Sequence, residues 1–130
     1  MKTDINLKRI LGIINAPSNK RYKNFINTVV DREYVWLLDG GEGYCTYDID
    51  NEINIIVYPE KAIADYFSNG ATPVMMEIHD FCRECKNLIK EKNIGFAVCP
   101  NEVDAIKVSP QVLYEDLLAA LEEVEDFMEI

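Results

Sequence analysis

The sequence has few of the features that mark several classes of protein. It contains one histidine, one tryptophan and four cysteines in 130 residues. Its uncharged apolar runs fall far short of the roughly 18 residues that a spanning helix needs, so we expect no membrane protein. Every mechanism that needs an imidazole would depend on His79. The remaining composition, 48% hydrophobic and 28% charged, is typical of a globular chain of one domain.

Basic side chains are also scarce, and they are unevenly placed. The net charge is −10, and residues 108–130 carry seven acidic side chains and no basic one. Residues 1–32 carry seven basic and two acidic side chains, whereas residues 33–107 carry six basic and fourteen acidic ones. Phosphate binding draws on clustered lysine and arginine, so the charge excludes nucleic acid as the main ligand. An acidic surface keeps a protein dispersed and attracts a basic partner.

The beginning of the chain has no clear secretion signal. The apolar run at residues 10–14 follows Lys8 and Arg9, but it is too short for a signal sequence and no small-residue cleavage site follows it. We therefore expect a cytoplasmic protein with reduced thiols that are buried as small hydrophobic side chains. These thiols are Cys45, Cys82, Cys85 and Cys99.

Residues 34–59 hold most of the β-branched and aromatic residues, and the other elements are arranged around them. Turn sequences at 39–43 and 50–52 divide this stretch into three runs, which predicts a three-stranded meander. Residues 94–99 and 103–108 predict a later hairpin, and residues 72–77 predict extended chain. Apolar spacing and end signals predict helices at residues 5–15, 18–30, 59–68, 78–92 and 110–128. We expect Ser109 to cap the last of these helices, which has its apolar residues on one inward face.

The predicted fold class is therefore α+β, with an antiparallel or mixed sheet of about five strands covered by about four to five helices. The meander and the later hairpin supply the strands. We expect residues 1–16 to form an N-terminal amphipathic arm or short helix, and residues 17–130 to form a single α+β domain.

Several short motifs in the sequence are more specific together than each is alone. They are Arg21-Tyr22 with Phe25, Val35-Trp36-x-Leu38, Tyr58-Pro59, Asp80-Phe81 and Val98-Cys99-Pro100. Together they resemble a bacterial family known as domain of unknown function 2750, over about residues 18–124. The resemblance implies an α+β cytoplasmic domain and supplies no activity, cofactor or catalytic residue. In one departure, Cys82 and Cys85 stand where the family carries ordinary apolar residues.

One set of residues has the spacing of metal ligands. His79, Cys82 and Cys85 follow one another at intervals of three, Cys99 is a possible fourth ligand, and Zn²⁺ favours four nitrogen or sulfur ligands. The two helical cysteines share the apolar stripe of the predicted helix, however, and a second ligand pair is missing. Core thiols are the favoured interpretation, and metal binding is a weaker alternative. Their position inside the helix also disfavours redox chemistry, which places such a pair at a helix N-terminus.

The leading functional hypothesis is a non-enzymatic protein-binding or inhibitor module of the immunity type, without a cofactor. The sequence lacks a catalytic constellation, and its acidic surface would steer it toward a basic protein such as a toxin. The alternative is a small-molecule sensor or enzyme with a pocket near the meander, lined by Tyr34, Trp36, Tyr47 or Tyr58. For Tyr34 and Trp36 a place in the core is favoured over an exposed binding platform, because a central strand buries both faces.

Overall fold

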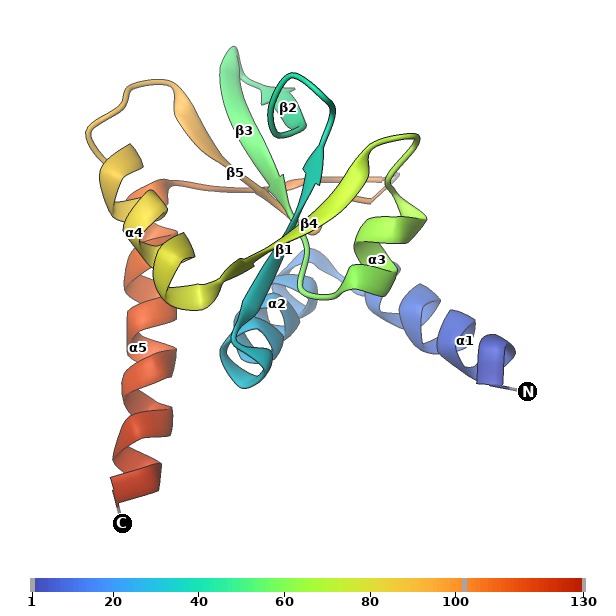
Figure 1. Cartoon of the computed structure of the whole chain (residues 1–130), viewed down its shortest axis with the longest axis horizontal. Helices are drawn as coiled ribbons and strands as arrows, with labels where there is room; N and C mark the ends of the chain where they lie inside the picture. The colour runs from blue at the N-terminus through green and yellow to red at the C-terminus, as the bar shows by residue number, and fades with distance from the viewer. Residues whose placement is uncertain (1, 102, 130) are drawn as a thin grey trace.

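The computed structural model describes residues 2–101 and 103–129, and it describes side chains from residue 6 to residue 125 apart from residue 102. This part of the chain contains both helices and strands in a mixed order, which confirms the α+β class (Figure 1). No helix in the described ranges is both long enough and apolar enough to cross a membrane. The elements are α1 (Lys2–Ile14), α2 (Ser18–Arg32), β1 (Tyr34–Asp39), β2 (Thr46–Ile49), β3 (Glu52–Val57), α3 (Lys61–Tyr66), β4 (Thr72–Glu77), α4 (Ile78–Leu88), β5 (Ile94–Val98), β6 (Ile106–Val108) and α5 (Pro110–Glu129).

The strands form two sheets. The larger is a mixed sheet of four strands in the order β2-β3-β5-β6, and the smaller is an antiparallel pair of β1 and β4. In the larger sheet β3 and β5 run parallel, because the chain crosses over through α3, β4 and α4 between them. The predicted hairpin near residues 94–108 is confirmed as the antiparallel pair of β5 and β6.

The predicted three-stranded meander is only partly correct. β2 and β3 form the expected hairpin, and Asp50 and Asn51 turn it with φ of 54° and 65°, as a tight hairpin turn requires. β1, however, pairs along its whole length with β4, which the sequence predicted only as extended chain. β1 meets the four-stranded sheet at isolated bridges, one of which joins Trp36 and Tyr58 through N–H···O bonds of 2.9 and 2.8 Å. After the glycine-containing turn, Tyr44 bridges Asp39 and the N–H of Cys45 donates to the carbonyl of Leu38 at 2.7 Å, so only the residues before β2 pair with the end of β1.

The core lies where the helices meet the two sheets. Phe81 of α4 and Phe96 of β5 pack edge to face with ring centroids 5.4 Å apart, and each is 1% exposed. α5 presents Leu113 and Leu117, one turn apart, to the same core, and both are fully buried. Ser109 caps α5 as predicted, because its Oγ accepts a hydrogen bond of 3.2 Å from the N–H of Val112. The C-terminal part of α5 extends beyond the rest of the chain (Figure 1).

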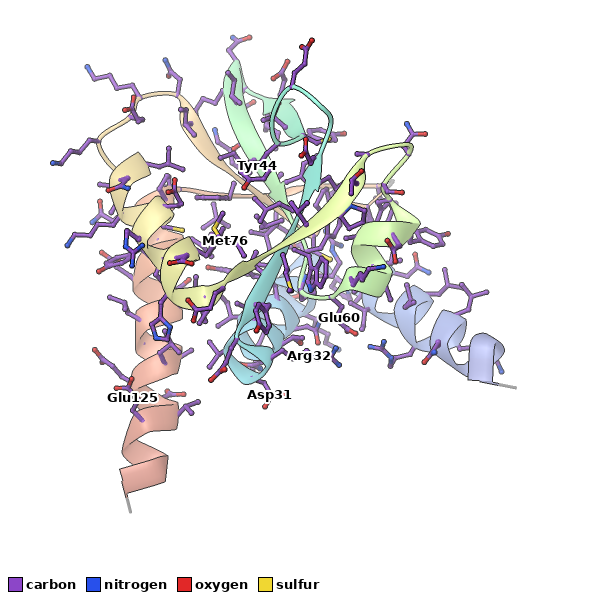
Figure 2. The ribbon with its side chains drawn as sticks, in the orientation of Figure 1. Asp31, Arg32, Tyr44, Glu60, Met76 and Glu125 are labelled. Atoms are coloured by element: carbon purple, nitrogen blue, oxygen red, sulfur yellow. The ribbon has the colours of Figure 1, made fainter. Side chains whose placement is uncertain are left out.

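Two buried charged side chains connect parts of the chain that are distant in sequence. Arg21, at the start of α2, is 2% exposed and bonds to the segment after β5. Glu60, just before α3, is 5% exposed and forms ion pairs with Arg9 of α1 and Arg32 of α2. Figure 2 labels Glu60 and Arg32, the two members of one of these ion pairs. These contacts connect α1 and α2 to the segments that follow β3 and β5.

Candidate functional site

Two hollows follow one another along the line between α2 and α5, and we call them together the α2–α5 groove. Each helix contributes side chains at intervals of four residues, which place them on one face. They include Tyr22, Ile26 and Val30 from α2, and Asp116, Ala120 and Val124 from α5. Asn27 lines both hollows and joins them.

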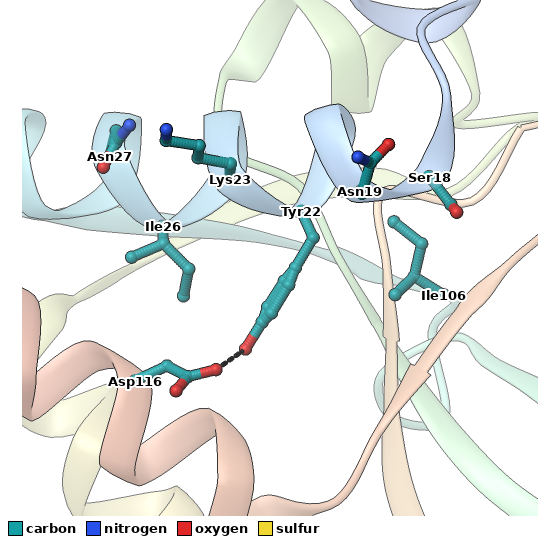
Figure 3. Close-up of a pocket in the computed structure, with 8 residues that line it drawn as sticks. All are labelled: Ser18, Asn19, Tyr22, Lys23, Ile26, Asn27, Ile106 and Asp116. Atoms are coloured by element: carbon teal, nitrogen blue, oxygen red, sulfur yellow. Dashed lines mark hydrogen bonds between the residues drawn. The ribbon is translucent and has the colours of Figure 1, made fainter.

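The first hollow has a volume of about 510 Å³ and an apolar interior. The ring of Tyr22 crosses from α2 toward α5, where its hydroxyl donates a hydrogen bond of 2.5 Å to Oδ2 of Asp116 (Figure 3). Ile26 and Ile106 lie on either side of this ring. The lining residues are Ser18, Asn19, Tyr22, Lys23, Ile26, Asn27, Ile106 and Asp116.

The second hollow has a volume of about 440 Å³ and lies beside the later turns of both helices. Val30 of α2 and Ala120 and Val124 of α5 supply its apolar surface, and Val124 is 43% exposed. Its carboxylates come from Asp31, Glu33 and Glu123, all exposed. The groove therefore combines an apolar floor with an acidic edge.

The charge of the groove is strongly negative. Of the described side chains that line it, four are acidic and Lys23 is basic. Burial raises the pKa of Tyr22, and its hydrogen bond to the Asp116 carboxylate raises that pKa further, so the phenol stays a donor at neutral pH. No histidine or cysteine is among the described residues that line the groove.

Comparison with known proteins assigns the chain to a family. A family model described as "Protein of unknown function (DUF2750)" matches residues 22–117, which is 96 of the 130 residues. The chain belongs to the DUF2750 family. No curated protein and no solved structure matches it with significant similarity. The matched region begins at Tyr22 and ends just after Asp116, so it includes both members of the hydrogen bond that spans the groove.

In this DUF2750 protein the four aromatic residues proposed for a pocket differ widely in burial. Tyr58 is 2% exposed and its ring stacks on Phe67 at 5.7 Å, whereas Tyr47 on β2 is 48% exposed. Tyr34 is 41% exposed and Trp36 is half-buried, with Trp36 bonded through its backbone to Tyr58. None of the four lines the α2–α5 groove. Tyr34 and Trp36 are therefore less buried than a central strand implies, because β1 lies in a two-stranded sheet.

The proposed metal ligands are divided between the surface and the core. His79 is exposed, and its Nδ1 lies 2.6 Å from Oε1 of Glu77, which raises the pKa of the imidazole. Cys82, Cys85 and Cys99 are 7%, 0% and 1% exposed, as expected for core thiols. Within the described residues no group of three or more histidine, cysteine, aspartate or glutamate side chains is arranged to hold a metal ion.

The four cysteines should react with an aromatic disulfide reagent in two well-separated phases. Cys45 is partly exposed, whereas burial raises the pKa of Cys82 and Cys85 and raises that of Cys99 to about 11. The native protein should therefore release about one equivalent of chromophore quickly and the rest only as it unfolds. Cys45→Ser should remove the fast phase, and rapid release of several equivalents would contradict the buried placement.

The groove is not directly indicated by the sequence. Tyr22 and Asp116 lie on two different helices, α2 and α5. Their hydrogen bond joins residues 94 positions apart, which no local pattern reports. Two features of the sequence pointed toward the groove. Tyr22 and Ile26 lie four residues apart on α2, and α5 has acidic side chains but no basic one.

Proposed function

We propose that this protein is a non-enzymatic binding module that takes a basic, amphipathic helical segment of another protein in the α2–α5 groove. The observation that carries the proposal is the groove itself, an apolar floor between two helices with Asp31, Glu33, Asp116 and Glu123 at its edge. An amphipathic helix binds such a groove through apolar side chains at intervals of three and four residues. Its basic face would then meet the carboxylates.

The charge of α5 supports a basic occupant in particular. Residues 108–130 contain no lysine or arginine, and the described acidic side chains of α5 are exposed. Complementary charge accelerates encounter and rejects acidic competitors, while the buried apolar contacts supply most of the affinity. The finer role that we propose is inhibition of a basic protein, as an immunity protein neutralises a toxin.

Charge reversal at Glu123 should weaken the binding of a fluorescently labelled helical peptide that carries leucine on one face and lysine on the other. We expect Glu123→Lys to raise the Kd about tenfold, because it replaces attraction with repulsion at the edge of the second hollow. Fluorescence anisotropy measures the Kd. Binding of the unaltered protein should weaken as salt is added, since these charges are exposed.

Glu91→Lys is the matched control, because Glu91 is also exposed and undergoes the same change of charge but lies after α4, away from the groove. It should leave the Kd within about twofold of the unaltered value, as expected for a screened distant charge. Equal weakening by both variants would mean attraction to net charge alone. Failure of the lysine peptide to bind, or equal binding of a peptide with glutamate in place of lysine, would also overturn the proposal.

A further inference from the structure

A polar cleft of about 560 Å³ lies on the other side of a ridge that Asn27 and Asp31 form along α2. α1 and the residues just before α3 complete its walls. Figure 2 labels Asp31, Arg32 and Glu60, three of the residues that line it. The full lining is Arg9, Ile13, Asn24, Asn27, Thr28, Asp31, Arg32 and Glu60.

Two guanidinium groups share one buried carboxylate in this cleft. Nη1 of Arg9 lies 2.7 Å from Oε2 of Glu60, and Nη1 of Arg32 lies 3.4 Å from Oε1. The side chain of Glu60 is 6% exposed, whereas those of Arg9 and Arg32 are 43% and 56% exposed. Each guanidinium has five N–H donors, so most of them stay available to a ligand. Glu60 therefore holds both guanidinium groups in place, and its single negative charge balances only one of their two positive charges.

Asn24 adds a donor without a partner. Its Nδ2 is buried and has no hydrogen bond, while its Oδ1 accepts one of 3.4 Å from Oγ1 of Thr28. A buried amide nitrogen without an acceptor is destabilising, and such groups in native proteins call for an explanation. Asn24 lines the cleft, so a rotation of its side chain would bring this buried donor to an acceptor atom of a ligand there.

We propose that this cleft binds the oxyanion of a small molecule, a carboxylate or a phosphate, between Arg9 and Arg32 with Nδ2 of Asn24 as a further donor. Guanidinium groups present paired donors that match the oxygens of both anions. Asp31 at the ridge disfavours an anionic group on its own side of the cleft, and Ile13 offers an apolar contact to the rest of the ligand. This site is separate from the protein-binding function proposed above.

Nuclear magnetic resonance of the ¹⁵N-labelled protein tests the site directly. Inorganic phosphate and succinate are added separately at constant ionic strength. At least one should cause saturable shifts of the Asn24 side-chain amide and of the Arg32 Nε–H. Arg32→Gln should weaken that binding about tenfold or more, as expected for loss of a charge-assisted contact. Lys20→Gln removes an exposed cation from the same helix outside the cleft and should leave the affinity unchanged.

Asn24→Leu is a second variant that preserves every charge. It removes the unpartnered donor, so it should keep or raise the melting temperature while it weakens the binding. Response to succinate alone would assign a carboxylate ligand, and response to phosphate alone a phosphate ligand. The proposal is overturned if neither anion gives saturable shifts, or if Arg32→Gln and Asn24→Leu bind as the unaltered protein does. Glu123→Lys should not affect this titration, so it separates this site from the groove.

Discussion

Replacing Arg21 with methionine should lower the free energy of unfolding by about 3–4 kcal/mol, because two backbone carbonyls and one carboxylate lose a charged hydrogen-bond donor. The Arg21 side chain is 2% exposed. Its Nε donates to the carbonyl of Cys99 at 3.3 Å and its Nη1 to that of Ala16 at 2.9 Å, while Nη2 bonds to a carboxylate oxygen of Asp104. Methionine fills a similar volume but leaves both carbonyls without this donor. For a chain of this length the melting temperature should fall by about 10 °C.

Lys20→Met and Asp104→Asn are the controls for this experiment. Lys20 is the exposed neighbour of Arg21 on the same helix, so its replacement should change stability by less than about 0.5 kcal/mol. Asp104→Asn keeps a hydrogen-bond acceptor near Arg21 but leaves the buried guanidinium without its counter-charge, so it should cost about 2 kcal/mol. Denaturant unfolding gives all three values. A loss for Arg21→Met no larger than that for Lys20→Met would show that the buried contacts contribute nothing.

Arg21 and Tyr22 are adjacent in the sequence but contact different parts of the fold. Arg21 faces inward and fastens the start of α2 to the segment after β5, while Tyr22 faces the α2–α5 groove. The segment that Arg21 holds leads directly into β6, which brings Ile106 to the first hollow. Loss of Arg21 should therefore loosen one wall of the groove as well as the core.

Periodicity in the sequence was sufficient to locate most elements, because it reports which face of each is buried. The apolar positions of α5, its cap at Ser109 and the hairpin of β5 and β6 were all predicted and are all present. The pairing of β1 was not predictable in this way. Its apolar residues specify a strand with two covered faces but carry no information about which strand lies beside it.

β4 was also hard to predict because of Pro73. Proline lacks an N–H for a ladder and is confined to strand edges, so it made residues 72–77 resemble extended chain. In the structure Pro73 stands opposite Leu38 in a sheet of only two strands, where β4 has a free edge. The groove was likewise not predictable from the sequence. It depends on which face of α5 approaches α2, and the sequence specified only that α5 is acidic and amphipathic.

The contact of Gly95 with Asn54 is a tertiary constraint that the sequence does not reveal. The two residues are opposite each other on the parallel strands β3 and β5. A Cβ at residue 95 would lie 2.7 Å from Oδ1 of Asn54 and 3.3 Å from the carbonyl oxygen of Val108. Asn54 is fully buried, and its Nδ2 donates to the carbonyls of Tyr47 and Glu52 at 3.2 and 3.1 Å, which restricts its movement.

Gly95→Ala should consequently lower the free energy of unfolding by about 2 kcal/mol, within the usual range for an overpacked core. Gly12→Ala is the matched control: residue 12 lies in α1, its Cβ would meet nothing within 4 Å, and the change should stabilise by about 0.5–1 kcal/mol. Asn54→Ala should relieve the main clash, so the double variant Asn54→Ala/Gly95→Ala should be at least about 1 kcal/mol more stable than additivity of the single variants predicts. Additive effects in denaturant unfolding would show that Asn54 moves aside freely and that the glycine is not needed for this contact.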